Sequence, residues 1–322
     1  MPTLGIVGTL VWDRIWYADP GRTEPVEEWG GIGYALEAFE AAAGDWTARP
    51  IVKVGRDLYD RAGEFLGRLR TIESRAGVRA VDARNVRVEL RYTDRGRRSE
   101  RLSGALPAWA FAELEPLLGG LDALYVNFIV GNEMELETLA AVRRAFAGPI
   151  YGDLHSLSLA TGPAGERSLR PLPGGRAWLR AFDVAQMNED ELGTIAAGWG
   201  DPWRLAADVV GGSTRVLFVT LGARGTAYFA APDFEGLGHA RPALESGAPV
   251  RSGRIACASV EEGDPTGCGD VWGITCFLGL LQGAPLLDAA ARANAAAARN
   301  VRHLGATGLH RHLRGELQAP ER

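Results

Sequence analysis

Short apolar runs alternate along most of the chain with stretches whose apolar residues recur at helical spacing. The runs of strand length lie at residues 3–7, 50–54, 123–130, 149–154, 183–187 and 215–221. The stretches with helical spacing lie at residues 58–69, 134–146 and 189–197. Such an alternation of strands and helices predicts a mostly parallel sheet that is covered by helices on both faces.

Residues 86–93 break this pattern, because polar and apolar residues alternate there with a period of two. A turn at 94–96 leads into a second strand at 98–102, which predicts a β-hairpin with one polar face. Many arginines lie in this region, namely Arg84, Arg87, Arg91, Arg95, Arg97, Arg98 and Arg101. They either contact an acidic ligand or form a solvated surface, and the second interpretation is favoured.

A charged, glycine-rich segment at 263–270 runs into an apolar stretch at 271–281. The junction predicts a helix N-terminus with Gly267, Cys268 and Gly269 at its start and Asp270 in the first turn. Free N–H groups at such an end favour anions, and glycines let a phosphate approach the backbone. A carboxylate beside this site fits phosphoryl transfer, with Asp270 accepting the proton of the attacking hydroxyl. The alternative is an aspartate that only caps a helix.

Composition narrows the possible functions. The 322 residues carry a net charge of -5, so no basic excess indicates nucleic-acid binding. No apolar run reaches the length of a membrane span, and the N-terminus lacks a signal-peptide pattern. The three cysteines have neither disulfide nor zinc spacing, so we expect a cytoplasmic protein. No break in composition marks a second domain, which predicts one domain at 1–310 and a loose C-terminal tail at 311–322.

Lys53 is the only lysine in the chain. Its sequence context excludes a Walker A loop, which needs G-K-[ST], and the motif set of protein kinases. Any nucleotide chemistry would therefore depend on backbone amides, arginine and metal.

The segment 264–270, D-P-T-G-C-G-D, resembles the D-T-T-G-A-G-D signature of the ribokinase-like (PfkB) carbohydrate kinase family. The resemblance implies a three-layer α/β/α sandwich with a small β lid, formed here by about residues 12–30 and 84–105. It implies that Asp270 is the catalytic base and that the amides of Gly267, Cys268 and Gly269 hold the phosphoryl charge. Pro265 and Cys268 depart from the signature, but neither change removes those amides.

Other stretches resemble substrate-site motifs of the same family. Gly30 and Gly31 match the glycine pair of G-G-x-x-x-N, although Ala35 stands where the family has asparagine. Residues 54–57, V-G-R-D, resemble its V-G-x-D element. The resemblance implies an acceptor site built from Asp13, Gly30, Gly31, Lys53, Gly55 and Asp57. For Lys53 and Asp57 an ordinary surface ion pair is the alternative.

Two more stretches resemble the nucleotide site, namely N-x-x-E at 188–191 and T-L-G-x-x-G at 220–225. The resemblance implies that ATP is bound by Asn188, Thr220, Gly222, Arg224, Gly225 and Asn294. Glu191 and Asp264 would help to arrange Mg²⁺ and its waters. Carboxylates that merely suit the helix dipole are the alternative for 189–191. A monovalent cation near the anion site is common in the family.

These features together imply an ATP-dependent kinase that phosphorylates a hydroxymethyl group of a sugar or sugar-like small molecule. A nucleoside kinase of the same family is one alternative. A non-catalytic relative that binds a metabolite or partner is another, and the missing asparagine at Ala35 supports it. A Rossmann dehydrogenase is rejected, because Leu36 breaks the glycine fingerprint. Sheet edges in the lid would allow a homodimer.

Overall fold

The computed structural model describes residues 1–17, 24–92, 98–210, 214–237 and 249–317. Three pieces of the sequence predictions lie outside these residues. They are residues 18–23 of the lid, residues 93–97, which include the predicted turn with Arg95 and Arg97, and residues 318–322 of the tail.

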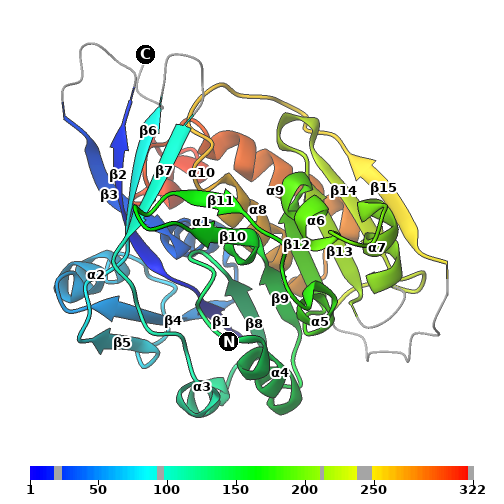
Figure 1. Ribbon diagram of the computed structural model, residues 1–322, viewed down its shortest axis with the longest axis horizontal. Coiled ribbons are helices and arrows are strands. Elements are labelled where there is room, and N and C mark those ends of the chain that lie inside the picture. The colour runs from blue at the N-terminus through cyan, green and yellow to red at the C-terminus, as the bar shows by residue number, and fades with distance from the viewer. Residues whose placement is uncertain (18–23, 93–97, 211–213, 238–248, 318–322) are drawn as a thin grey trace.

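A nine-stranded sheet forms the middle layer of the molecule (Figure 1). Its strand order is β15-β14-β13-β12-β9-β8-β1-β4-β5. The strands from β13 to β5 pair in parallel, and β14 and β15 continue one edge in antiparallel pairing. The strands are β1 (Thr3–Val7), β4 (Thr47–Gly55), β5 (Val78–Val81), β8 (Ala123–Asn127), β9 (Ile150–Asp153), β12 (Val184–Asn188), β13 (Val216–Thr220), β14 (Thr226–Ala230) and β15 (Arg251–Ile255). The predicted mostly parallel sheet is confirmed.

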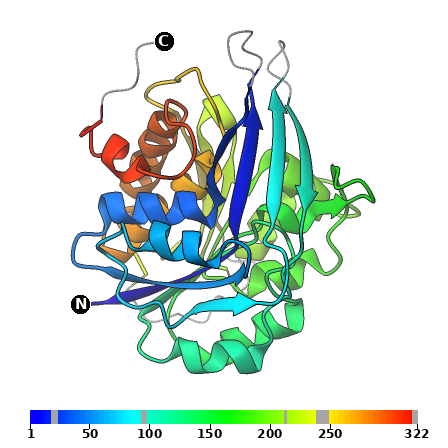
Figure 2. The ribbon, with the colours of Figure 1, turned by 90° about the vertical axis from the view of Figure 1, so that its left-hand side faces the viewer.

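Helices cover both faces of this sheet (Figure 2). One group, whose members pack against one another, is α1 (Ile32–Ala42), α8 (Cys268–Leu281), α9 (Leu286–Asn300) and α10 (Leu309–Leu313). The group on the other face is α3 (Phe111–Leu118), α4 (Leu136–Ala145), α5 (Gly175–Arg180), α6 (Glu189–Ile195) and α7 (Pro202–Val210). Helix α2 (Tyr59–Leu66) packs against β4. Within the described ranges, no helix has the length and apolar character needed to cross a membrane.

The core follows from the strand sequences. All five residues of β1 and of β8 are buried, as expected for parallel strands that have helices on both sides. Helix α8 lies against β8 and β9, and its apolar run is buried almost throughout. Helix α8 is therefore held firmly against the sheet, and its N-terminus and the loop before it have a defined position.

A second, four-stranded sheet of order β3-β2-β6-β7 stands at one end of the molecule (Figure 1). Its strands are β2 (Leu10–Trp16), β3 (Val26–Gly31), β6 (Arg87–Tyr92) and β7 (Arg98–Ser103). The two predicted lid segments thus form one sheet, and the predicted hairpin is the antiparallel pair β6–β7. A two-stranded sheet of β10 (Leu159–Thr161) and β11 (Arg167–Leu169) adjoins β7.

The structure corrects the prediction of a loose tail from residue 311. Helix α10 packs on α1 and α9, and His312 within it is buried. Glu37 of α1 accepts hydrogen bonds from the backbone N–H groups of Gly308 and His310, each at 3.0 Å. The partners of α10 on α1 and α9 lie far away in the sequence, so no local pattern marks this contact.

Candidate active site

The glycine-rich segment ends at the N-terminus of α8, as the sequence predicts. Gly267 is the N-cap residue, with a φ of 77° that residues with side chains rarely adopt. A Cβ at this position would also collide with the ring of Tyr34. Both constraints require glycine here, and they fix the direction in which the first turn of α8 points.

This first turn leaves backbone N–H groups available. The N–H of Cys268 donates to Pro265 O at 3.1 Å. No hydrogen bond within the described residues uses the N–H of Gly267 or Gly269. Unpaired N–H groups at a helix N-terminus favour negative charge. Two of the three predicted amides can therefore bind an anion without losing an existing partner.

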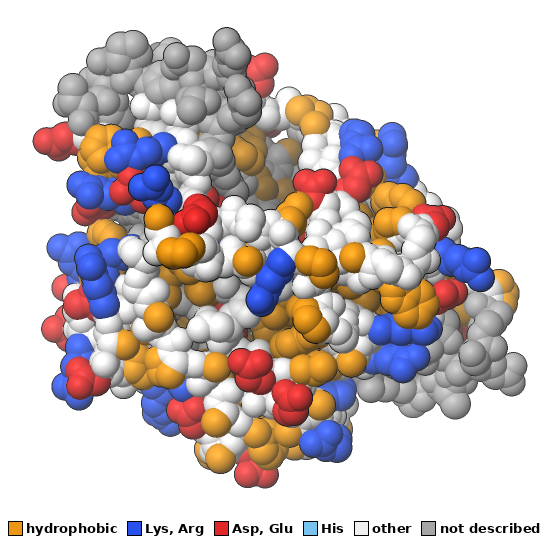
Figure 3. All heavy atoms as spheres, viewed as in Figure 1, with side chains coloured by type: hydrophobic (Ala, Val, Ile, Leu, Met, Phe, Trp, Pro, Cys, Tyr) orange, Lys and Arg blue, Asp and Glu red, His pale blue; other side chains and the backbone are white. Residues whose placement is uncertain are grey.

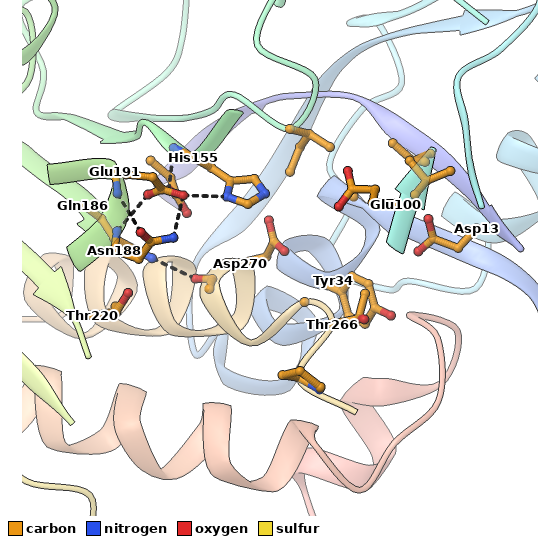
Figure 4. Close-up of a pocket in the computed structure, with 18 of the residues that line it drawn as sticks. Asp13, Tyr34, Glu100, His155, Gln186, Asn188, Glu191, Thr220, Thr266 and Asp270 are labelled. Carbon is orange, nitrogen blue, oxygen red and sulfur yellow. Dashed lines mark hydrogen bonds and ion pairs between the residues drawn. The ribbon is translucent and has the colours of Figure 1, made fainter. Parts of the chain in front are cut away.

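Asp270 lies in the first turn of α8 and lines a cavity (Figure 4). Asn127, the last residue of β8, donates from Nδ2 to Asp270 Oδ1 at 2.7 Å. Burial raises the pKa of Asp270 to about 6, although His155 and the hydrogen bond from Asn127 act in the opposite direction. A carboxyl group with this pKa is largely ionised at neutral pH and basic enough to accept a proton from a hydroxyl group.

Three more ionisable side chains line the same cavity near β9 and β12. Asp153 ends β9, His155 begins the short 3-10 helix η1 (His155–Ser158), and Glu191 belongs to α6. His155 Nδ1 lies 3.1 Å from Glu191 Oε1. Partial desolvation lowers the pKa of the half-exposed His155 ring, but the hydrogen bond to Glu191 and the nearby carboxylates outweigh it and raise the pKa to about 10. Burial also raises the pKa of Asp153 well above its ordinary value. A single imidazolium thus stands among carboxyl groups.

Asn188 and Glu191 form a capping box at the start of α6 and both line the cavity. Asn188 Oδ1 accepts from the Glu191 N–H at 2.9 Å, and Glu191 Oε2 accepts from the Asn188 N–H at 2.8 Å. Glu191 Oε1 also accepts from Asn188 Nδ2 at 2.7 Å. The predicted N-x-x-E pair is therefore in the cavity, with much of the Glu191 carboxylate already used by protein donors.

Asp264, the second predicted metal residue, makes other contacts. Its carboxylate accepts hydrogen bonds from Tyr17 Oη at 2.9 Å, from Tyr92 Oη at 2.5 Å and from the Thr266 N–H at 2.9 Å. Tyr17 and Tyr92 belong to the lid, and their rings stack 5.6 Å apart. Asp264 thus joins the lid to the loop before α8. Among the described residues, no group of three or more His, Cys, Asp or Glu is arranged to hold a metal.

Two cavities meet at the N-terminus of α8. The first has a volume of about 230 Å³ and lies between the lid and the carboxyl ends of the central strands. The second, of about 310 Å³, lies between α8, α9 and the turn after β13. Thr220, Pro265 and Gly269 line both. Asp270 lines the first cavity next to this junction, where a group could pass from a ligand in one cavity to a ligand in the other.

Part of the predicted acceptor site lines the first cavity. Asp13 of β2 and Gly31 of β3 both line it, and Asp13 is buried. Gly30 lies behind Asp13, and a Cβ there would collide with the Asp13 carboxylate. Gly30 therefore leaves space for the Asp13 side chain, and Gly31 allows a backbone φ of 58°.

The other predicted acceptor residues line neither cavity, which differs from the prediction. Lys53 Nζ donates to Ala108 O and to Glu113 Oε2, both at 2.9 Å. Asp57 pairs with Arg87 at 2.7 Å and accepts from the Asn85 N–H at 2.8 Å. The N–H of Gly55 donates to the side chain of Asn85 at 3.0 Å. The V-G-R-D stretch thus anchors the base of the lid.

Most of the predicted nucleotide residues line the second cavity, namely Thr220, Gly222, Gly225 and Asn294. Arg224 forms an ion pair with Glu189 instead. Asn294 is engaged on both ends of its amide: Oδ1 accepts from Thr226 Oγ1 at 2.9 Å and from Trp272 Nε1 at 2.8 Å, and Nδ2 donates to Ile255 O at 3.2 Å. It therefore shapes the wall of the cavity by holding Trp272.

The sequence predictions missed several residues of the first cavity and its supports. Asn127 and Asp153 each end a parallel strand, so the rule that ligands bind at carboxyl ends of strands could have identified them. Gln186 donates to Gly269 O at 3.1 Å from the buried strand β12. Tyr34 and Glu100 also line the cavity, but no motif marks them.

No protein-family model and no curated protein sequence matches the chain. Solved structures do match over nearly the whole length. Ribokinase from Thermotoga maritima is 19% identical, with a TM-score of 0.72, covering 98% of this chain and 99% of that one. The nucleoside kinase of Burkholderia thailandensis in complex with inosine is 17% identical, with a TM-score of 0.71 and coverages of 96% and 94%.

A pyrophosphate-dependent kinase in the ribokinase family, complexed with a pyrophosphate analog and myo-inositol, is similar to the same degree. It is 16% identical, with a TM-score of 0.71 and coverages of 98% and 100%. At sequence identities this low, the structural similarity establishes the architecture, and the reaction must be inferred from the residues of the site. The chain has the ribokinase-like fold, a three-layer α/β/α sandwich with a small β lid.

Proposed function

We propose that this protein is a phosphotransferase that moves the γ-phosphoryl group of ATP to a hydroxymethyl group of a sugar or sugar-like small molecule. The observation that carries the proposal is the place of Asp270. Its carboxylate lies in the first turn of α8, beside unpaired N–H groups and at the junction of two cavities. The fold supports the same class, since the solved structures described above include a ribokinase and a nucleoside kinase.

In the proposed reaction the acceptor hydroxyl lies in the first cavity, beside Asp270. As its oxygen forms a bond to the γ-phosphorus, the bond from that phosphorus to the β–γ bridging oxygen breaks, and the hydroxyl proton moves to Asp270. The N–H groups of Gly267 and Gly269 face the growing negative charge on the transferred group. Asn127 holds one oxygen of Asp270, which leaves the other oxygen to accept the proton.

The donor would lie in the second cavity. Its wall includes Val260, Trp272, Ala297, Ala298 and Val301, which suits the flat face of a nucleobase. A pyrophosphate donor would not need this apolar space. We therefore favour ATP over pyrophosphate, although a similar structure belongs to a pyrophosphate-dependent kinase.

The residues near the junction fit a magnesium ion held mainly by water and by the donor phosphates. Glu191 and Asn188 would hold its waters, because most of the Glu191 carboxylate is already bonded to protein donors. When bound, the ion would neutralise charge on the donor phosphates.

The test is a screen for ADP release with ATP across sugars, polyols and nucleosides, followed by Asp270→Asn. We expect the variant to lose about 10²- to 10⁴-fold in kcat, because the base is gone, while the Kd for ATP stays within a few-fold. Asp288→Asn is the matched control, since Asp288 is an exposed aspartate in the first turn of the neighbouring helix α9.

Undiminished turnover in Asp270→Asn would refute the assignment of the base. If no acceptor in the screen released ADP although ATP bound, the non-catalytic alternative would replace the proposal. ADP release with nucleosides and not with sugars would select the nucleoside kinase.

A further inference from the structure

The lid contributes one wall of the first cavity, and the register of its strands decides which side chains face inward. Val88 and Leu90 of β6 line the cavity, and Glu100 of β7 stands directly opposite Leu90. Asp13 of β2 is in register with Val88. Residues that are paired in this way project from the same face of a sheet. The inner face of the lid therefore presents apolar groups and two carboxylates.

The lid arginines near the cavity point elsewhere. Arg87 pairs with Asp57, and Arg91 pairs with Glu89 and lies over the ring of Trp16. Basic and acidic side chains lie side by side on the face of the lid that Figure 3 shows. Within the described residues, no lysine or arginine lines the first cavity. An acidic acceptor would find no arginine of this part of the chain to bind it.

Carboxyl groups outnumber cationic side chains among the described residues that line the cavity. Its carboxyl groups are Asp13, Glu100, Asp153, Glu191 and Asp270. The one cationic side chain that lines it in the described part of the chain is His155, which Glu191 already engages. Figure 4 shows Asp13 and Glu100 together at the end of the cavity away from His155 and Glu191. A phosphate or carboxylate at that end would be repelled by both side chains.

Two polar groups at this end have no protein partner in the described part of the chain. Tyr34 is 1% exposed and lines the cavity, yet none of the hydrogen bonds there uses its hydroxyl group. The carboxylate of Glu100 takes part in no hydrogen bond or ion pair among the same residues. The charge of Glu100 acts on Arg167, but that guanidinium does not line the cavity. The Tyr34 side chain is buried and Glu100 is half-buried, and both face the cavity. Polar groups in such places are normally satisfied, so a ligand with donor groups would be the partner for this end of the cavity.

We propose that Tyr34 and Glu100, together with Asp13, form the acceptor subsite. The acceptor is then a polyhydroxy compound that carries no phosphate or carboxylate group, either neutral or bearing an amine. Its hydroxyl or ammonium groups donate to Glu100 and Asp13, and Tyr34 Oη bonds to one of its oxygens. A volume of about 230 Å³ suits a small molecule, because drug-sized ligands take about 300–1,000 Å³. This inference rests on the proposed function and names its substrate class.

The experiment measures binding without a phosphoryl donor, by isothermal titration calorimetry. The probes are D-ribose, myo-inositol, inosine, glucosamine, gluconate and ribose 5-phosphate. We expect at least one neutral or amine-bearing probe to bind, and each acidic probe to bind about tenfold more weakly or not at all. An acidic probe as the tightest ligand, or no binding by any neutral or amine-bearing probe at millimolar concentration, would overturn the inference.

Variants then locate the subsite. Glu100→Gln and Tyr34→Phe should each weaken the best probe by about tenfold and leave the Kd for ATP unchanged. Glu100→Lys should gain affinity for gluconate. Glu89→Gln is the matched control, because Glu89 is a lid carboxylate that pairs with Arg91 and does not line the cavity. If Glu100→Gln and Glu89→Gln bound the best probe with the same Kd, Glu100 would not be part of the subsite.

The two proposals fail in different ways. A neutral ligand that binds as expected without any ADP release would refute the kinase and leave the subsite standing. Release of ADP with ribose 5-phosphate or gluconate as the preferred acceptor would keep the kinase and refute the substrate class.

Discussion

Single residues in this site owe their chemistry to their surroundings. Burial at the start of α8 raises the pKa of Asp270 to about 6. Asn127 and His155 limit that rise, since each stabilises the charged form. A general base works best when its pKa lies near the working pH. The opposing effects on the pKa of Asp270 thus bring it into the range that the proposed general base requires.

The pH dependence of the reaction tests this balance. Asp270 accepts a proton only when it is ionised, so kcat/KM should be lost as the pH falls through about 6 and level off above it. Asn127→Leu removes a hydrogen bond that lowers the pKa of Asp270, so the acidic limb should move to higher pH. The measurement is the pH profile of kcat/KM. Asn132→Leu is the control, because Asn132 is exposed, and its profile should not shift. If the acidic limb of the kcat/KM profile stayed unchanged in Asn127→Leu, Asp270 would not be the group that titrates.

At the scale of elements, the start of α8 is determined by a close approach to α1. Gly267 is left-handed and its Cα lies against the ring of Tyr34, a residue of α1. The same contact holds both Tyr34 and Gly267 at the wall of the first cavity, where we propose that the phosphoryl group is transferred. The lid is joined to this point as well, through the bonds from Tyr17 and Tyr92 to Asp264.

Gly267→Ala should therefore lose both stability and activity. Any alanine with a positive φ costs about 1–2 kcal/mol, and at Gly267 the new Cβ must also displace the Tyr34 ring. Gly283→Ala separates the two effects, because Gly283 has a φ of 83° and open space around its Cα. We expect the free energy of unfolding in urea to fall by more in Gly267→Ala than in Gly283→Ala, and only Gly267→Ala to lower kcat. Equal losses would show that the contact with Tyr34 is unimportant.

At the scale of the whole molecule, the chain's C-terminal region completes the layer formed by α1, α8 and α9. Leu309 is fully buried, and Glu37 of α1 binds the start of α10. His310 adds a hydrogen bond of 2.5 Å to Glu37 from Nδ1. Residues up to Leu313, where α10 ends, therefore belong to the domain rather than to a tail.

Leu309→Ala should lower the free energy of unfolding by about 2–5 kcal/mol, because it leaves a cavity between α1 and α10. Leu304→Ala, at a site that is 38% exposed, should change it by about 0.5 kcal/mol or less. Thermal and urea unfolding of the two variants provide the comparison. A small effect at Leu309 would mean that α10 contributes little to the stability of the domain.

Local sequence patterns predicted most of the secondary structure and the centre of the site. Buried strands and helix faces have local signals, so the predicted elements agree with the observed ones to within a few residues at most positions. The glycine-rich turn into an apolar helix is also local, and it placed Asp270 correctly in the first turn of α8. The lid hairpin was predicted because alternation with a period of two depends only on neighbouring residues.

Contacts between distant parts of the chain determine which side chains meet. Asn127, the neighbouring pair Asp153 and His155, and Glu191 come from three separate segments, and parallel strands bring these segments to one edge of the sheet. Asp57 matches the V-G-x-D motif and Lys53 directly precedes it, yet neither lines the cavity, and each pairs with a distant partner, Arg87 and Glu113 respectively. Glu100 and Tyr34 face the cavity because of strand register and helix packing, which involve residues far apart in the chain and leave no local pattern in the sequence.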